Sequence, residues 1–497
     1  MHSTTDAGAD ADADAGAEQR SRLTTLLHRV AWIAGVALFA LVALVALNRL
    51  ADRVVAFLAG LGAPAALPAA AGVLAWAVLA IGLVVGMERA ARRVSPGAVL
   101  AIGLGAVAVA QAVVAVIVDA PLVADWLAYH EAAIEIAAEG PALGDRPIGY
   151  PALLAVAYRL FGAQTWVAEA LNVGAGLLAA TLLFDLLRRA GGVRVAAVGI
   201  GLFAGMPSLA LMTPVVSTEP MYGAMILLVA WAVAVPGVLI GALAAGATLG
   251  LSQYVRPSSF VLLPAIAVAV AIGRERSRLV STAAVVVAFL LALSPVIADN
   301  LAQRGELSLA TSSFGGFGIL VGTNQAADGR FNEADAELLR TLPGDTLRER
   351  SDAAGRLGVQ RITEDPIGFA GLAVRKFAGL WSDDGYAAFY ALGWQRASPL
   401  PAPILAGANL ASQLAWVAVT ILAAWGVWRS GPRPPAWLLT TILVAGSVTL
   451  LHAVVEVQPR YHAYLAPLWI GVAAMGLVAL ADRRRNRAGH TAADASV

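Results

Sequence analysis

Long apolar segments separated by arginine-containing loops are the feature that most constrains this chain. A helix needs about 20 apolar residues to cross a bilayer, and about 12 segments approach that length. They lie at residues 30–48, 68–87, 97–118, 165–187, 194–213, 219–235, 237–254, 257–273, 279–298, 402–428, 435–455 and 462–481. Helices satisfy their own backbone groups in lipid. The predicted fold class is therefore an all-α polytopic membrane protein with about 12 transmembrane helices.

Composition supports this prediction. Of the 497 residues, 59% are apolar and only 13% are charged, whereas soluble domains carry about 25% charged residues. The net charge of +1 gives no reason to expect a nucleic-acid partner. The chain has no cysteine, which excludes disulfides, thiolate metal sites and cysteine nucleophiles.

Arginine clusters assign the loops to the two sides of the cell membrane. Nearly every second loop is a cluster, and the series ends in a basic tail over residues 483–497. Cytoplasmic loops are enriched in Lys and Arg, so both termini are predicted to be cytoplasmic. Residues 1–29 begin with an acidic, low-complexity leader and are predicted to be a disordered cytoplasmic N-terminus.

Two long loops, residues 119–164 and 299–401, then lie outside, and function is expected there. The first is predicted to contain two short interfacial helices. The second contains a glycine-rich segment, a polar helix from Asn332 to Glu364 and a short amphipathic helix over 367–381. This last helix is expected to lie on the membrane surface.

Asp125 is the first candidate for chemistry. It stands in VADWLAYHEA (122–131), directly after an apolar segment ends. It is expected near the N-terminus of a short helix, as a capping carboxylate held at a fixed depth beside the acyl chains. There it could act as a general base between a lipid-borne and a water-borne substrate. A lone aspartate at a boundary is also compatible with a membrane anchor or a solvated loop residue.

Several motifs in chain order resemble the GT-C class of membrane glycosyltransferases, and most closely the dolichyl-phosphate-mannose mannosyltransferase and aminoarabinose transferase superfamily. They are Asp125 with Tyr129 ahead of RPIGYPALLAVAYRLFG (146–162), then VVSTEPMYGAMILL (215–228), YVRPSSFVLLP (254–264), FGGFGILVGTNQAADGRF (314–331), VRKFAGLW (374–381) and PRYHAYLAPL (459–468). The resemblance covers roughly residues 100 to 480. It implies a GT-C-like transmembrane core over 97–298 and C-terminal transmembrane helices over 402–482, with residues 30–96 as an extra N-terminal transmembrane hairpin.

The resemblance implies a hexosyl- or pentosyltransferase that moves a sugar from a polyprenyl-phosphate donor to an acceptor glycan, lipid or protein at the outer face. Asp125 is then the general base. An inverting step is predicted, because one base and no paired nucleophile is visible. The leaving lipid phosphate needs cationic donors, and the candidates are Arg460 first, then Arg256, Lys376 and Arg146. Headgroup anchoring is an equal alternative for Arg460 and Lys376 and is favoured for Arg146. Further candidates for the substrate site are Tyr129, His130, Glu219 and Tyr461.

No cofactor is required by the sequence, and no metal is predicted. The region around Asp125 has no Asp-X-Asp pair, and the histidines lack the spacing of zinc ligands. Asp383 and Asp384 are interpreted as structural or solvated loop residues. Glu219, at the outer end of a span, is as compatible with complementing the helix dipole as with the site.

The main alternative is a multi-span transporter or flippase of a lipid-linked or small solute, since twelve spans with both ends inside is a common transporter count. That class predicts charged residues within spans and internal repeats. The spans here are almost free of charge, and no repeat is evident. A polysaccharide polymerase or ligase on another fold, and a scaffold with a binding role, are further alternatives.

Overall fold

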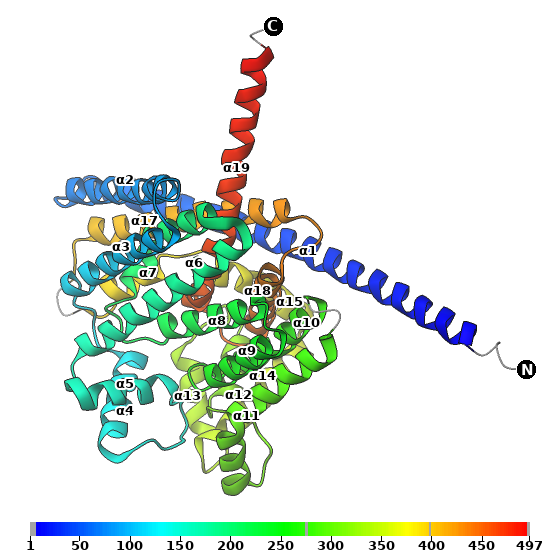
Figure 1. The fold of residues 1–497 in the computed structure, drawn as a ribbon. Coiled ribbons are helices and arrows are strands. Elements are labelled where there is room, and N and C mark those ends of the chain that lie inside the picture. Colours follow the sequence, from blue (N-terminus) through cyan, green and yellow to red (C-terminus); the bar gives the residue numbers. More distant parts are fainter. Residues whose placement is uncertain (1–5, 274–276, 397–398, 495–497) are drawn as a thin grey trace, which may run out of the picture.

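The chain folds into a helical bundle with a second group of helices at one end (Figure 1). The computed structural model describes residues 6–273, 277–396 and 399–494, and throughout these ranges the regular elements are helices. The all-α architecture predicted from the sequence is therefore confirmed.

Eight helices are long and apolar enough to cross a membrane within the described ranges, which makes this a multi-pass membrane protein. They are α1 (Asp6–Ala59), α2 (Ala66–Ala90), α3 (Pro96–Ile117), α6 (Thr165–Ala204), α11 (Arg278–Arg304), α17 (Ala402–Ser430), α18 (Ala436–Val454) and α19 (Ala466–Asp494). Shorter apolar helices follow in the middle of the chain, namely α8 (Glu219–Ala234), α9 (Val238–Gln253), and the turn η1 (Ser259–Leu262) that continues into α10 (Leu263–Gly273).

The predicted count of twelve crossings is not confirmed. The predicted segment 165–187 and most of the segment 194–213 lie in α6, which is two helices joined at a kink, and the rest of the second segment lies in the short helix α7 (Pro207–Leu211) and its flanking residues. The backbone leaves the helical conformation only at Gly192, with φ 83° and ψ 175°. Glycine adopts such a positive φ without steric cost, so a sharp break is built there.

The N-terminus also differs from the prediction. Where a disordered leader was expected over residues 1–29, α1 continues back to Asp6, and residues 1–5 lie outside the described residues. Alanine has the highest helix propensity of all residues, and alanines alternate with acidic residues in this leader. Figure 1 shows this end of α1 extending away from the bundle.

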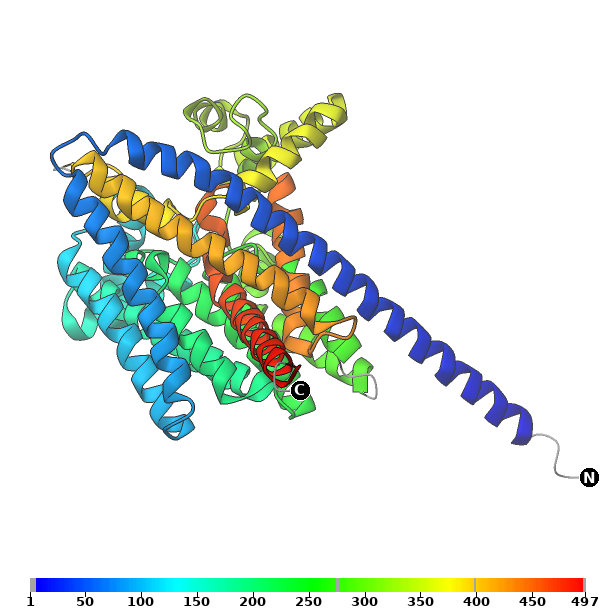
Figure 2. The ribbon, with the colours of Figure 1, turned by 90° about the horizontal axis from the view of Figure 1, so that it is seen from above.

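The bundle is held by close helix contacts at small residues. α1 lies along α17 (Figure 2), and α17 crosses α19 at Gly426 and Gly476. A Cβ on Gly476 would collide with the carbonyl oxygen of Leu422, and a Cβ on Gly426 with that of Val472. Small residues let membrane helices approach this closely, so the two glycines set the distance between α17 and α19.

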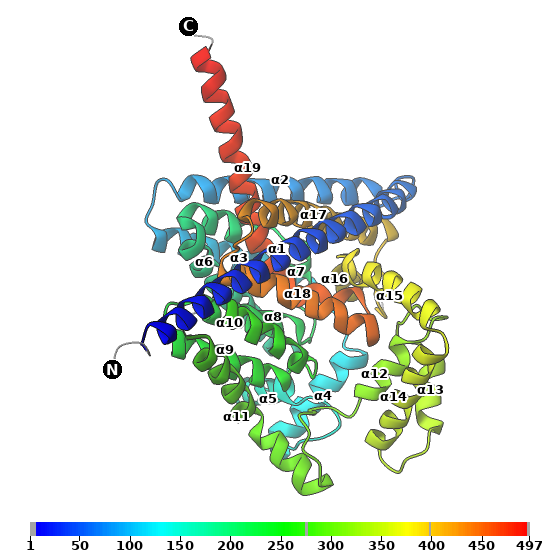
Figure 3. The same ribbon diagram turned by 90° about the vertical axis from the view of Figure 1, so that its right-hand side faces the viewer.

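The helices of the two long loops are shorter. They are α4 (Ala124–Glu139) and α5 (Gly149–Phe161) in the first loop, and α12 (Gly315–Gly322), α13 (Glu333–Thr341), α14 (Leu347–Glu364), α15 (Pro366–Trp381), α16 (Tyr386–Ala388) and the π-helical turn η3 (Phe389–Gly393) in the second. Figure 3 shows α12, α13 and α14 as a group beside α15. The polar helix predicted from Asn332 to Glu364 is two helices, because Pro343 and Gly344, with φ 142°, interrupt it.

The two long loops meet at one end of the bundle, as the predicted topology requires. The backbone N–H and the hydroxyl of Ser313 donate to Asp145 at 2.9 and 2.6 Å, and Arg396 donates to the carbonyl oxygen of Asp119 at 2.6 Å. Residues from several predicted cytoplasmic segments also come together. Arg194 bridges Glu88 at 2.8 Å and Asp482 at 2.5 Å. Which end faces the cytoplasm stays a prediction.

Candidate active site

Asp125 lies in the first turn of α4, but it does not cap that helix. Val123 is the N-cap residue and no side chain caps it. The carboxylate instead accepts hydrogen bonds from Nη2 of Arg460 at 2.9 Å and Nη1 of Arg146 at 3.4 Å. Burial alone would raise the pKa of Asp125, but the charges and hydrogen bonds of the two arginines outweigh it and hold the pKa below its ordinary value. Asp125 is therefore ionised at neutral pH.

Glu219 continues this contact, so that Asp125, Arg460, Glu219 and Arg256 form a row of alternating charges. It is the first residue of α8 and only 4% exposed. Its Oε1 lies 2.7 Å from Nη2 of Arg256 and 4.0 Å from Nε of Arg460. No side chain caps α8, but Glu219 lies in its first turn, where a carboxylate also complements the helix dipole as the alternative interpretation expected. A buried carboxylate between two guanidinium groups orients both of them.

Aromatic rings enclose the two arginines. The Tyr461 ring lies 5.2 Å from Cζ of Arg256 and 5.6 Å from Cζ of Arg460. Tyr390 contributes a second ring to Arg460 at 5.5 Å. Cations within about 6 Å of a ring face are attracted by its quadrupole. Arg460 and Arg256 are thus held by ion pairs and by rings, in the short helix η4 (Pro459–Leu465) and in the loop before η1.

Tyr129 and His130 lie one helical turn beyond Asp125. Burial, with the negative charges of Asp125 and Glu219, raises the pKa of Tyr129 to about 12, so its hydroxyl stays protonated at neutral pH. His130 turns toward α5, where its Nδ1 lies 2.6 Å from the hydroxyl of Tyr158. The charges of Asp125 and Glu219 therefore act on Tyr129, whereas the hydrogen bond of His130 joins α4 to α5.

Lys376 lies in the interior of the protein. It is 1% exposed, and its Nζ donates to the carbonyl oxygens of Gly322 at 2.7 Å and Ala453 at 3.0 Å. These carbonyls are at the ends of α12 and α18. The ammonium thus joins two helix ends and is too buried to be a headgroup anchor, and its predicted contact with a donor phosphate stays a prediction. Burial lowers the pKa of Lys376 to about 7.

Three contributors to the site were missed by sequence reasoning. Tyr390 donates to Oε1 of Gln458 at 3.1 Å, and Nε2 of Gln458 donates to Glu456 at 2.5 Å. Burial raises the pKa of Glu456. The only signal in the sequence was the position of Glu456 and Gln458 just before Arg460. Nothing local marked Tyr390, which reaches Arg460 through the fold.

The adjacent acids Asp383 and Asp384 are structural, and the solvated alternative is wrong. Asp384 is fully buried, 3.3 Å from Nε2 of His462, and Asp383 is paired with arginines of α1. Across the described ranges, no three His, Asp or Glu side chains are grouped so as to hold a metal ion.

Part of the chain is similar in sequence to a known family. A family model described as dolichyl-phosphate-mannose-protein mannosyltransferase matches residues 145–298. The core of the chain is similar to these mannosyltransferases. The match confirms the resemblance inferred from the sequence motifs, and it contains Arg146, Glu219 and Arg256. Asp125 and Arg460 lie outside the matched residues of this mannosyltransferase-like core. No curated protein matches the chain.

Two solved structures are similar to this chain. One is ArnT from Cupriavidus metallidurans bound to undecaprenyl phosphate, with 17% identity over 77% of each chain and a TM-score of 0.36. The other is the same ArnT in the apo state, with 17% identity over 70% of this chain and 71% of that chain and a TM-score of 0.31.

Proposed function

We propose that this protein transfers a sugar from a polyprenyl-phosphate donor to an acceptor glycan, lipid or protein at the outer face of the membrane, with inversion and with Asp125 as the general base. The contact between Asp125 and Arg460 is the observation that carries the proposal. It puts a carboxylate and a cation suited to a phosphate side by side, at the end of a membrane bundle where two long loops meet. The mannosyltransferase match over residues 145–298 supports a lipid-phosphate donor.

The step needs few groups. The acceptor hydroxyl attacks the anomeric carbon while its proton passes to Asp125. The new carbon–oxygen bond forms as the bond from the anomeric carbon to the phosphate oxygen breaks, and the electron pair leaves with the polyprenyl phosphate. That phosphate gains negative charge, which Arg460 stabilises by charge-assisted hydrogen bonds.

A phosphate bound by the other N–H groups of Arg460 would compete with Asp125 for the positive charge of the guanidinium. In the structure, Nη2 of Arg460 is committed to Asp125, while its Nε has no hydrogen-bond partner and lies 4.0 Å from Glu219. Donor binding therefore draws Arg460 toward the phosphate and weakens its hold on the carboxylate. Since Arg460 lowers the pKa of Asp125, this exchange makes Asp125 a stronger base when the donor is in place.

Arg256 and Glu219 extend the charged site beyond Arg460. The buried carboxylate of Glu219 lies between the cations Arg256 and Arg460 and within ion-pair distance of both. Two cations next to each other would otherwise repel in a region of low dielectric. The carboxylate between them lets both guanidinium groups remain near the expected phosphate.

Purified protein in lipid vesicles tests the proposal, with radiolabelled undecaprenyl-phosphate mannose and undecaprenyl-phosphate arabinose as donors and a membrane extract as acceptor. Release of undecaprenyl phosphate with a product of inverted anomeric configuration, read by NMR, is the expected result. Movement of the intact donor across the vesicle membrane without cleavage would instead support the flippase alternative. Retention of configuration would overturn the single-displacement step.

A further inference from the structure

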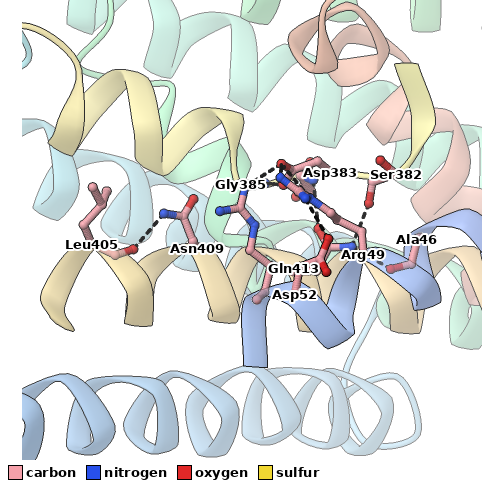
Figure 4. A network of polar contacts seen from close by, with 11 residues as sticks. Ala46, Arg49, Asp52, Ser382, Asp383, Gly385, Leu405, Asn409 and Gln413 are labelled. Carbon is pink, nitrogen blue, oxygen red and sulfur yellow. Dashed lines mark hydrogen bonds and ion pairs between the residues drawn. The ribbon is translucent and has the colours of Figure 1, made fainter. Parts of the chain in front are cut away.

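The N-terminal helix α1 reaches toward the candidate active site through two arginines, Arg49 and Arg53, one turn apart. Nε and Nη2 of Arg49 each lie 3.3 Å from Oδ2 of Asp383, and Nη2 of Arg53 contacts the same oxygen. The other carboxylate oxygen accepts the backbone N–H of Gly385 at 2.9 Å. Figure 4 shows this network. The Asp383 side chain is 11% exposed, so both of its oxygens are used in a largely dry setting.

α17 takes part in the same network through Gln413. Nε2 of Gln413 donates to the carbonyl oxygens of Ala46 at 2.8 Å and Ser382 at 2.7 Å, and its Oε1 accepts the N–H of Asp384 at 3.1 Å (Figure 4). Gly385 has no room for a side chain, because a Cβ would meet Oδ1 of Asn409 and lie 2.9 Å from Nη2 of Arg53. The start of the segment 382–394 is thus hydrogen-bonded to both α1 and α17.

The segment then runs through α16 and η3 and contacts Arg460 and Trp126, the residue next to Asp125. Tyr390 places its ring 5.5 Å from Cζ of Arg460. Tyr390 and Trp394 also pack edge-on against Trp126, at 5.0 and 5.1 Å between ring centroids. Trp126 follows Asp125 directly in α4.

We infer that Arg49 and Arg53 are positioning residues, which hold Asp383 and thereby fix the segment 382–394 so that Tyr390 keeps Arg460 beside Asp125. This inference rests on the proposed function. It gives a role to α1, which lies outside the residues matched by the mannosyltransferase family. Arg53→Gln leaves Arg49 as the one arginine on the largely buried Asp383, and Asp383→Asn removes the shared acid of both arginines. Either change weakens the ion pairs that hold this segment, so the segment is free to shift. Arg460 then loses its Tyr390 ring, and its contact with Asp125 weakens.

The pH profile of transfer from undecaprenyl-phosphate mannose separates positioning from simple stabilisation. Arg53→Gln and Asp383→Asn should lower turnover about tenfold, as expected when reacting groups are misplaced by a fraction of an ångström. They should also move the acid limb to higher pH, because Arg460 no longer lowers the pKa of Asp125 fully. Arg53→Lys should restore most of the turnover and the position of the limb.

Arg194→Gln is the matched control. Arg194 is 23% exposed, compared with 20% for Arg53, and it likewise joins separate helices by ion pairs. It does so at the end where the predicted cytoplasmic residues gather, so its loss should leave the acid limb in place. If Arg53→Gln lowers only the yield of folded protein and its pH profile matches that of wild type, the inference is overturned.

A second measurement needs no activity. Because the chain has no cysteine, a single Ala391→Cys, at a fully buried position of η3, reports how often the segment opens. Labelling by a water-soluble maleimide should be about tenfold faster or more when Asp383→Asn is added, since labelling follows local opening. Leu392→Cys, at a partly buried position, is the substitute if the first variant does not fold.

The two possible failures are distinguishable. Equal labelling rates with and without Asp383→Asn overturn the inference. A folded wild-type protein that cleaves neither donor overturns the proposed function, whatever the labelling rates are.

Discussion

Arg460 and Asp125 are 335 residues apart in the chain, yet Nη2 of Arg460 lies 2.9 Å from Oδ2 of Asp125. The contact joins the first long loop to the short helix that precedes α19. The proposed chemistry needs both residues, the carboxylate as base and the guanidinium as phosphate ligand. Asp125 alone is an acid at a membrane boundary, and Arg460 alone is a cation at the start of a span.

Asp125→Asn should abolish sugar transfer while the protein still folds. The substitution keeps the shape and removes the proton acceptor, and general-base catalysis contributes about 10²–10⁴-fold. Transfer from undecaprenyl-phosphate mannose, with a thermal melt in detergent as the folding check, measures this. Glu131→Gln is the control, since Glu131 is exposed on the same helix. Undiminished transfer by Asp125→Asn would reject the assigned base.

Arg460→Gln should weaken binding of undecaprenyl phosphate. Hydrogen bonds to charged groups contribute about 1.5–3 kcal/mol, so a loss of roughly 10- to 100-fold in affinity is expected, measured by titration in detergent micelles. Arg340→Gln, an exposed arginine paired with Glu337 in the second loop, should bind as wild type does. Equal affinities for both variants would mean that Arg460 does not contact the phosphate.

The pH dependence of transfer should follow Asp125. A base is active when ionised, so turnover falls as the pH drops through its pKa in the folded protein. Arg146 and Arg460 both lower that pKa. Arg146→Gln removes one of them, and the acid limb should therefore move to higher pH, with turnover near the optimum less affected. A limb that moves to lower pH, or not at all, contradicts the assignment.

Lys376→Met should change stability and leave phosphate affinity unaffected. The ammonium joins Gly322 and Ala453, and burial lowers its pKa to about 7 from an ordinary value near 10.5. Between these two pH values the unfolded chain binds a proton that the folded chain lacks. Raising the pH through that range therefore favours the folded state of wild type. The melting temperature should rise with pH in wild type and rise less in Lys376→Met. A large loss of undecaprenyl-phosphate affinity would restore Lys376 as a phosphate ligand.

Gly476→Ala should destabilise the bundle. The added methyl group collides with the carbonyl oxygen of Leu422 where α17 and α19 cross. Overpacking of this kind costs about 1–3 kcal/mol, which is visible as a lower melting temperature in detergent. Gly446→Ala, in α18, has open space around the added Cβ and should be neutral or slightly stabilising.

Sequence reasoning succeeded where the signal is local. The apolar segments identified the membrane helices, and the polar gap between the segments 165–187 and 194–213 contains Gly192, where α6 is broken. Asp125, Arg460 and Tyr461 were found because short motifs around them resemble a family. Lys376 was assigned on the same grounds, but a motif says nothing about which way a side chain turns, and this one turns toward two carbonyl groups.

By itself, the sequence determined that this chain is a helical membrane protein, because burial of apolar residues and the need to satisfy backbone groups in lipid act within each segment. Its motifs also indicated residues that lie in the candidate active site. Only the tertiary structure decided which of those residues meet. The reason is physical: ion pairs such as Asp125–Arg460 and Arg53–Asp383 depend on distances across hundreds of residues, and those distances are set by how the helices pack.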